Sequence, residues 1–229
     1  MTSKKLVRLL IISTLSGFSF FCNAQDNRFS CGDSITDPRD GKTYGTVKIG
    51  NQCWFSENLN TGIQVDDMQQ TNNQIIEKTC YENLKVNCDQ FGGLYTWHQA
   101  MNWNDNPQGI CPAEWRIPSK EDWNELRMYL GYEEAGQKMK ITREHLPPWD
   151  GTNKSGFAAL PSGVGYESFF GRKGHWAVYW SSKQEDDEYA WFAQLDGYWY
   201  PAPPKYKILY IGNHFVKENG FSIRCIKTK

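Results

Sequence analysis

The chain has 229 residues, of which 25 are basic (Lys or Arg) and 26 are acidic (Asp or Glu). This near balance argues against a nucleic-acid-binding protein, which would gather an excess of basic residues on one face. Its 12 Phe, 12 Tyr and 10 Trp residues can bury a large apolar area, so one large folded domain is expected.

The first 24 residues have the order of a secretory signal peptide. A basic flank from Lys4 to Arg8 precedes an apolar stretch over residues 9–21, and small residues follow it. This order predicts cleavage after Ala24. Residues 25–229 are then the mature protein, and we expect them to form a single domain.

Cys22 offers an alternative, as the lipid-modified first residue of a lipoprotein. Such signals place a small residue directly before the cysteine, whereas Phe20 and Phe21 stand there. No later apolar run reaches the roughly 20 residues that span a bilayer, so no transmembrane segment is expected in the mature chain. The prediction is an exported protein, either secreted or associated with the cell surface or outer membrane, with lipid attachment at Cys22 as the alternative.

The mature chain keeps an even number of cysteines, which predicts disulfide bonds in an exported protein. Six cysteines allow many pairings, and their order along the chain favours Cys31 with Cys53, Cys80 with Cys88, and Cys111 with Cys225. A metal site is the weaker interpretation, because the chain has no CxxC pair and its four histidines are scattered.

Turn and strand signals come first in the mature chain. Asp40-Gly41 is a hairpin-turn dipeptide, and residues 44–49 and 52–59 are rich in β-formers, which predicts an antiparallel meander. Residues 61–78 are rich in Gln, Asn and Asp and have few apolar anchors. They predict a surface excursion outside the core.

Two helices are expected in the middle of the chain. Residues 94–103 carry apolar or small side chains at spacings of three and four, and a second helix begins after Pro118 with Ser119 as its N-cap and ends at Gly131. Beyond Lys140 the strand candidates are 176–181, 189–195, 208–211 and 221–226. Helices followed by strands, without βα alternation, predict the α+β class.

Several motifs occur in an order that resembles one family of exported bacterial proteins. They are residues 37–60 (DPRDGKTYGTVKIGNQCWFSENLN), 93–97 (GLYTW), 111–119 (CPAEWRIPS), 156–161 (GFAALP), 180–182 (WSS) and 222–225 (SIRC). Together they resemble the Fibrobacter succinogenes major paralogous domain. That family is similar to the C-type-lectin-like and formylglycine-generating-enzyme-like folds, so the resemblance implies two helices beside small antiparallel sheets with long loops. It implies no particular activity.

Aromatic side chains in the predicted loops are the candidate ligand-binding residues, because flat rings stack on sugar faces. The candidates are Trp191, Trp199, Tyr200 and the neighbouring pair His175 and Trp176. For Trp199 and Tyr200 the alternative is packing under the adjacent proline-rich turn. A lone histidine beside a strand is more often structural than catalytic.

A run of four carboxylates at 185–188 supplies Asp186, Asp187 and Glu188 as candidate metal ligands, with a solvated hairpin tip as the alternative. Residues 103–105 (Trp-Asn-Asp) resemble the sugar-binding run of calcium-dependent lectins. They precede Cys111, whereas in those lectins the run adjoins the last cysteine. Calcium is therefore not supported by motif position, and no cofactor is expected.

Catalytic motifs are missing from the sequence: it has no Gly-x-Ser-x-Gly elbow, phosphate-binding glycine loop or HExxH. The prediction is a non-catalytic binding module that recognises a glycan or an envelope protein through the loops at 140–204. The first alternative is an accessory or structural subunit of a cell-envelope complex. The second is a hydrolase, whose carboxylate pair would be close in space and invisible in sequence.

Overall fold

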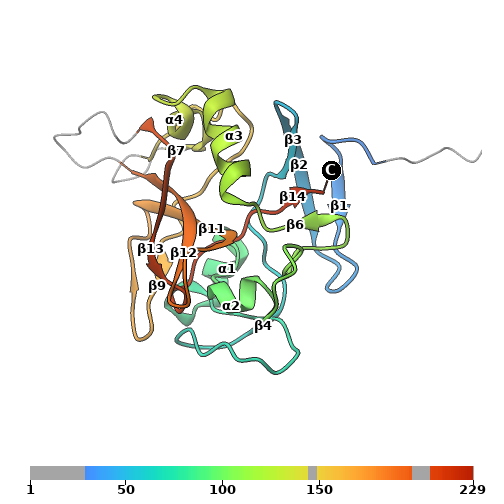
Figure 1. Cartoon of the computed structure of the whole chain (residues 1–229), viewed down its shortest axis with the longest axis vertical. Helices are drawn as coiled ribbons and strands as arrows, with labels where there is room; N and C mark the ends of the chain where they lie inside the picture. Colours follow the sequence, from blue (N-terminus) through green and yellow to red (C-terminus); the bar gives the residue numbers. More distant parts are fainter. Residues whose placement is uncertain (1–28, 144–148, 198–206, 229) are drawn as a thin grey trace, which may run out of the picture.

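A computed structural model describes residues 29–143, 149–197 and 207–228 (Figure 1). The predicted signal peptide, its cleavage after Ala24, and Cys22 lie outside the described residues, as do Trp199 and Tyr200. Figure 1 shows two antiparallel sheets on opposite sides of the molecule, with helices between and beside them.

The first sheet combines strands from both ends of the chain. Its order is β1 (Ser34–Thr36), β2 (Thr43–Ile49), β3 (Gln52–Phe55), β14 (Ile226–Lys227) and β6 (Trp115–Arg116). The predicted Asp40-Gly41 turn joins β1 to β2, with Thr36 opposite Thr43. The end of the chain therefore returns to the first hairpin, beside β3.

The second sheet has three strands in sequence order, β11 (Trp176–Gln184), β12 (Tyr189–Asp196) and β13 (Tyr210–Val216). Three pairs of shorter strands, each strand two residues long, complete the sheets of the described residues: β4 (Ile63–Gln64) with β5 (Glu77–Lys78), β7 (Thr142–Arg143) with β8 (Trp149–Asp150), and β9 (Val164–Gly165) with β10 (Phe170–Gly171). The predicted strand at 208–211 lies later, in β13, and residues 221–226 form bridges at Phe221 and Ser222 before β14.

Helix α3 (Lys120–Leu130) has the predicted N-terminus. Ser119 and Asp122 form a capping box, in which the Ser119 Oγ accepts from the Asp122 amide and the Asp122 carboxylate accepts from the Ser119 amide. Helix α2 (Trp97–Ala100) is shorter than the predicted helix at 94–103.

The expectation of two helices is wrong, since the described residues also contain α1 (Lys85–Phe91), α4 (Ala135–Met139) and the 3₁₀ helix η1 (Tyr81–Asn83). These elements are too short to show an apolar periodicity in the sequence.

Aromatic residues fill two adjoining cores. Neighbouring residues on β3 point to opposite sides, so that Trp54 packs on Trp123 of α3 at 4.8 Å between ring centroids, whereas Phe55 packs on Trp115 at 4.5 Å. On β11, Tyr179 and Trp180 divide between the same two cores.

The disulfides join the cysteines in the predicted pairs, Cys31–Cys53, Cys80–Cys88 and Cys111–Cys225. The third bridge joins residues 114 apart in sequence and is buried, and it ties the segment before β6 to the segment before β14. The fold is therefore α+β with small antiparallel sheets and three disulfides.

The expectation that residues 61–78 lie outside the core is wrong in part. Met68 is buried against Tyr81 and Leu94 in a small third cluster, and Glu77 and Lys78 are buried as well. Hydrogen bonds make this burial compatible with a polar sequence, since the Glu77 carboxylate accepts from the amide of Thr71 at 2.6 Å.

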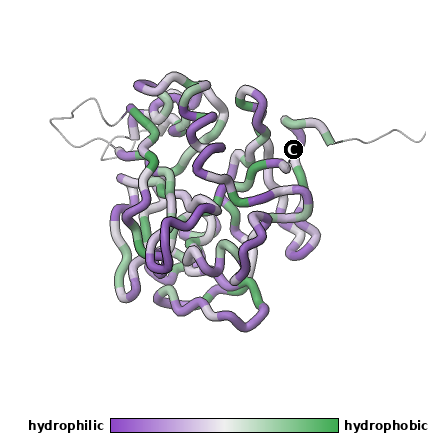
Figure 2. Tube along the Cα trace, in the orientation of Figure 1, coloured by the Kyte–Doolittle hydropathy of each residue, from purple (hydrophilic) through white to green (hydrophobic). Residues whose placement is uncertain are grey.

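Hydrophobic residues occur in short segments along the described trace (Figure 2). In that part of the chain, none of the helices has the length and apolar character needed to cross a bilayer.

Candidate functional site

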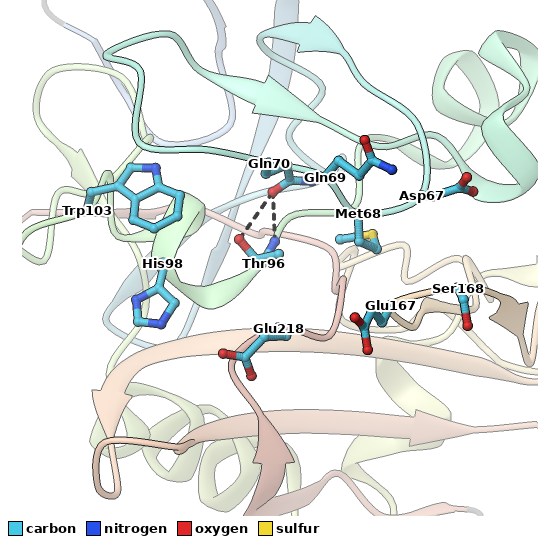
Figure 3. A pocket seen from close by; sticks show the side chains of 10 residues that line it. All are labelled: Asp67, Met68, Gln69, Gln70, Thr96, His98, Trp103, Glu167, Ser168 and Glu218. Atoms are coloured by element: carbon cyan, nitrogen blue, oxygen red, sulfur yellow. Dashed lines mark hydrogen bonds between the residues drawn. The ribbon is translucent and has the colours of Figure 1, made fainter.

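A large cavity lies where four segments distant in sequence meet (Figure 3). It has a volume of about 820 Å³ and is called the Trp103 cavity below. Its walls come from the loop at 67–70, helix α2 with the turn after it, the β9–β10 hairpin and the turn after β13. The residues that line it are Asp67, Met68, Gln69, Gln70, Thr96, His98, Trp103, Glu167, Ser168 and Glu218.

Gln70 fixes the polar loop against helix α2. Its Oε1 accepts from the Thr96 amide at 2.9 Å and lies 3.3 Å from Thr96 Oγ1, while its Nε2 donates to the Leu94 carbonyl at 2.9 Å. Thr96 in turn caps the helix, because its Oγ1 accepts from the Gln99 amide at 3.2 Å. Every one of these groups is buried, so the floor of the cavity is rigid.

Non-glycine residues with positive φ occur at two edges of the cavity. Asp67 and Met68 have φ values of 47° and 57°, and Asn102 and Trp103 have values of 52° and 56°. Residues other than glycine rarely adopt positive φ, and such backbone conformations persist only where the surrounding structure imposes them. At one edge, Gly220 leaves no room for a side chain beside Met68.

Trp103 and His98 form a stacked pair at one end of the cavity, with ring centroids 5.5 Å apart and planes 11° from parallel (Figure 3). The indole Nε1 is shielded from solvent and has no hydrogen-bond partner among the described residues. Burial and the charge of Lys217 lower the pKa of His98, and Glu218 opposes this only partly. The imidazole is therefore uncharged at neutral pH.

The remaining walls carry acceptors and negative charge. Asp67, Glu167 and Glu218 are all exposed on the cavity surface, and no Lys or Arg lines it. Lys217 is buried instead, with its ammonium donating to the carbonyl oxygens of Asp186 and Asp187 at 2.7 and 3.1 Å. The cavity thus combines three carboxylates with an aromatic ring.

The sequence model of the Fibrobacter succinogenes major domain matches residues 47–227 of this chain. The chain belongs to the Fibrobacter succinogenes major domain family. Searches of curated proteins and of solved structures find no match to this chain. All the residues that line the Trp103 cavity lie within the matched region.

Several residues of the motifs that indicated the Fibrobacter succinogenes major domain lie in its hydrophobic core and not in the wall of the Trp103 cavity. Trp54, Trp180, Arg224 and Cys225 are each fully buried. The guanidinium of Arg224 donates to Asn58 Oδ1 at 2.7 Å and to the carbonyl oxygen of Phe55 at 3.2 Å. These residues explain the fold of the family and leave its ligand open.

Of the residues predicted to bind ligand, Trp191, His175 and Trp176 lie within the described part of the chain, and none of the three lines the Trp103 cavity. The indole Nε1 of Trp191 donates to Glu185 at 2.7 Å, and the ammonium of Lys120 lies 3.5 Å from the centroid of its ring. The His175 carbonyl accepts from the Gly197 amide. Trp176 lines a separate pocket of about 320 Å³ on the second sheet of this Fibrobacter succinogenes major domain.

The carboxylates predicted to bind a metal form the turn between β11 and β12. Asp186 Oδ1 accepts from the amides of Glu188 at 2.9 Å and Tyr189 at 2.8 Å, and these hydrogen bonds lower the pKa of Asp186. Across the described segments of the chain, no three His, Cys, Asp or Glu side chains are placed to hold a metal ion. Calcium binding stays an untested prediction for Asp186, Asp187 and Glu188.

The sequence singled out Trp103 only for its resemblance to a calcium-dependent sugar-binding run in the wrong position, and the structure places it in the wall of the Trp103 cavity. Asn104 and Asp105 line a smaller pocket of about 180 Å³ that shares His98 and Trp103 with the first. The other cavity residues were missed. No sequence signal could have joined Asp67 to Glu218, because their proximity depends on the return of the chain past β13.

Proposed function

We propose that the chain is an exported, non-catalytic binding domain that holds a positively charged segment of a cell-envelope protein in the Trp103 cavity. The observation that carries this proposal is the composition of the cavity wall, with three carboxylates, one tryptophan ring and no basic side chain. Carboxylates attract an ammonium or guanidinium, and the face of a tryptophan adds cation–π attraction.

Location and architecture belong to the same proposal. Three disulfides and the absence of a membrane-crossing helix in the described residues are compatible with an extracellular protein. Export through a signal peptide that ends at Ala24 would deliver the chain to an oxidising compartment. A C-type-lectin-like architecture is supported by the return of β14 to the first hairpin and by the Cys111–Cys225 bridge.

Hydrolysis is the less favoured function for this cavity. Glu167 and Glu218 do line the same space, as a pair of catalytic carboxylates must. A general acid of that kind lies in an apolar pocket, which keeps it protonated, whereas both of these side chains are exposed. Binding needs only their charge.

Calorimetric titration with a matched pair of peptides tests the proposal. One peptide carries several lysines, and the other has the same sequence with every lysine acetylated, which removes the charge and keeps the length. We expect the mature protein to bind the first peptide and to lose affinity as salt is raised. Equal affinity for the two peptides, or no binding of either, would contradict the proposal.

Variants assign this binding to the cavity. The double variant Glu167→Gln/Glu218→Gln is expected to weaken binding by on the order of tenfold, since each exposed ion pair contributes up to about 1 kcal/mol. Trp103→Leu should weaken it by a further few-fold through loss of the cation–π attraction. Glu121→Gln on the exposed side of α3 removes one negative charge outside the cavity and should leave affinity unchanged.

A further inference from the structure

We infer that the second sheet carries a separate binding site for an uncharged sugar ring. The site is the pocket of about 320 Å³ bordered by Trp176, Gln194, Asp196, Tyr210, His214 and Phe215, called the Tyr210 pocket below. Its size lies at the lower end of the roughly 300–1,000 Å³ of small-molecule sites. None of these residues lines the Trp103 cavity, so the inference does not depend on the proposed function.

Strand register brings the polar and aromatic groups of the Tyr210 pocket together. Trp176 on β11 stands opposite Asp196 on β12, and Gln194 on β12 stands opposite Tyr210 on β13. Because Gln194 and Asp196 are two residues apart on one strand, they point to the same face of the sheet. A carboxylate and an amide therefore lie between two aromatic side chains.

A glycine gives Tyr210 its position. A Cβ atom on Gly212 would lie 2.6 Å from Cε1 of Tyr210 and 2.8 Å from Cζ of Phe192. Without that atom, the tyrosine ring can cross the strand above Gly212. Its side chain is still 43% exposed, so the ring presents a surface to a ligand.

The polar pair suits vicinal hydroxyl groups. Gln194 Nε2 donates to Asp196 Oδ1 at 2.5 Å, which fixes both side chains, and the amide and carboxylate oxygens of the pair can accept hydrogen bonds. Neighbouring hydroxyls of a sugar can donate to such a pair, while its C–H face stacks on an aromatic ring. The groups needed for both kinds of contact line one small pocket.

Charge favours a neutral ligand over an ionised one. The guanidinium of Arg172 lies 4.8 Å from the ring centroid of Trp176, and Asp196 is the carboxylate that lines the pocket, so charges of both signs lie near the site. An acidic sugar would meet Asp196, and an organic cation would meet Arg172. The Trp103 cavity differs because its three carboxylates have no basic residue beside them on the cavity wall.

Saturation-transfer NMR with methyl β-D-glucopyranoside tests this inference. All ring substituents of that sugar are equatorial, so its axial C–H groups present an apolar face. Glucuronic acid is the charged counterpart of similar size. We expect saturation transfer to the glucoside at millimolar concentration and at least fivefold weaker transfer to glucuronic acid.

Two kinds of variant test whether the glucoside binds in the Tyr210 pocket. Tyr210→Ala removes the stacking ring, whereas Asp196→Asn keeps the side-chain shape but weakens acceptance of hydrogen bonds from the sugar hydroxyls. Each variant should reduce glucoside affinity about fivefold. Gly212→Ala should act like Tyr210→Ala by displacing the ring. Far-ultraviolet circular dichroism and the urea midpoint confirm that each variant is folded, and Asp196→Asn keeps the test valid if Tyr210→Ala unfolds.

The matched control is the Glu167→Gln/Glu218→Gln variant, which should bind the glucoside as well as the natural protein does. The inference is overturned if the glucoside shows no saturation transfer or if glucuronic acid binds equally well. It is also overturned if folded Tyr210→Ala and Asp196→Asn variants keep full affinity. Loss of glucoside binding in the cavity control would move the sugar to the Trp103 cavity and overturn it too.

Discussion

Replacing Arg224 by methionine should destabilise the domain by about 3 kcal/mol. The guanidinium is fully buried and donates to three acceptors, which are Asn58 Oδ1 and the carbonyl oxygens of Phe55 and Phe157. Methionine has similar length but no donor, so all three acceptors lose a partner inside the core. Each such loss costs roughly 1–3 kcal/mol. We take the low end for each, because the substitution also removes the desolvation penalty of the buried guanidinium charge.

The assay is urea unfolding of the mature protein with its disulfides intact, followed by tryptophan fluorescence. At a slope of about 1–3 kcal/mol per molar urea, the expected loss lowers the midpoint by at least about 1 M. Arg224→Lys should also destabilise, because a compact ammonium cannot reach three acceptors spread around a planar guanidinium. A positive charge at position 224 would then not be enough to keep the stability of the domain.

The matched control is Lys227→Met, which removes a positive charge three residues away. Lys227 pairs with the exposed Glu114 at 2.7 Å, and exposed pairs of this kind contribute less than about 1 kcal/mol. If Arg224→Met shifts the midpoint no more than Lys227→Met does, the guanidinium is not an essential hydrogen-bonding centre and the reasoning from burial is refuted.

Three further predictions concern stability. Asp122→Asn should cost about 2 kcal/mol at pH 7. Burial opposes its charge, yet Arg116 and Ser119 hold the pKa of Asp122 below its usual value, so urea titrations should show this loss shrinking as pH falls below about 4. Burial and Lys42 lower the pKa of Lys78 to about 7, so the unfolded chain binds more protons above that pH. Urea stability should therefore rise from pH 7 to 9, and Lys78→Met should abolish that rise. Alanine replacement of both cysteines of the Cys111–Cys225 bridge, which spans 114 residues, should lower the free energy of unfolding by about 5 kcal/mol in thermal or urea unfolding. The same replacement of the Cys80–Cys88 bridge, which spans 8 residues, should lower it by about 2.5 kcal/mol. Equal losses would contradict the loop-entropy argument.

Local sequence signals predicted the elements that form from neighbouring residues. The Asp40-Gly41 turn, the Ser119 cap and the strands at 176–181 and 189–195 all appear close to their expected positions. Turns, caps and period-two patterns are set within a few residues, so they can be recognised without a structure. The disulfide pairs follow the same logic for Cys80–Cys88, whose partners lie only 8 residues apart.

The sequence by itself determined the α+β class, the strong local elements and membership of a family whose motifs are mostly core residues. Only the tertiary structure decided where the cavities lie. The Trp103 cavity joins residues 67 and 218, and its buried polar loop depends on hydrogen bonds from Gln70 to a helix more than 20 residues away. Such contacts arise from chain return and side-chain pairing, which leave no periodic signal in the sequence. The function therefore has to be argued from the cavity walls, whereas the fold could be read largely from the chain.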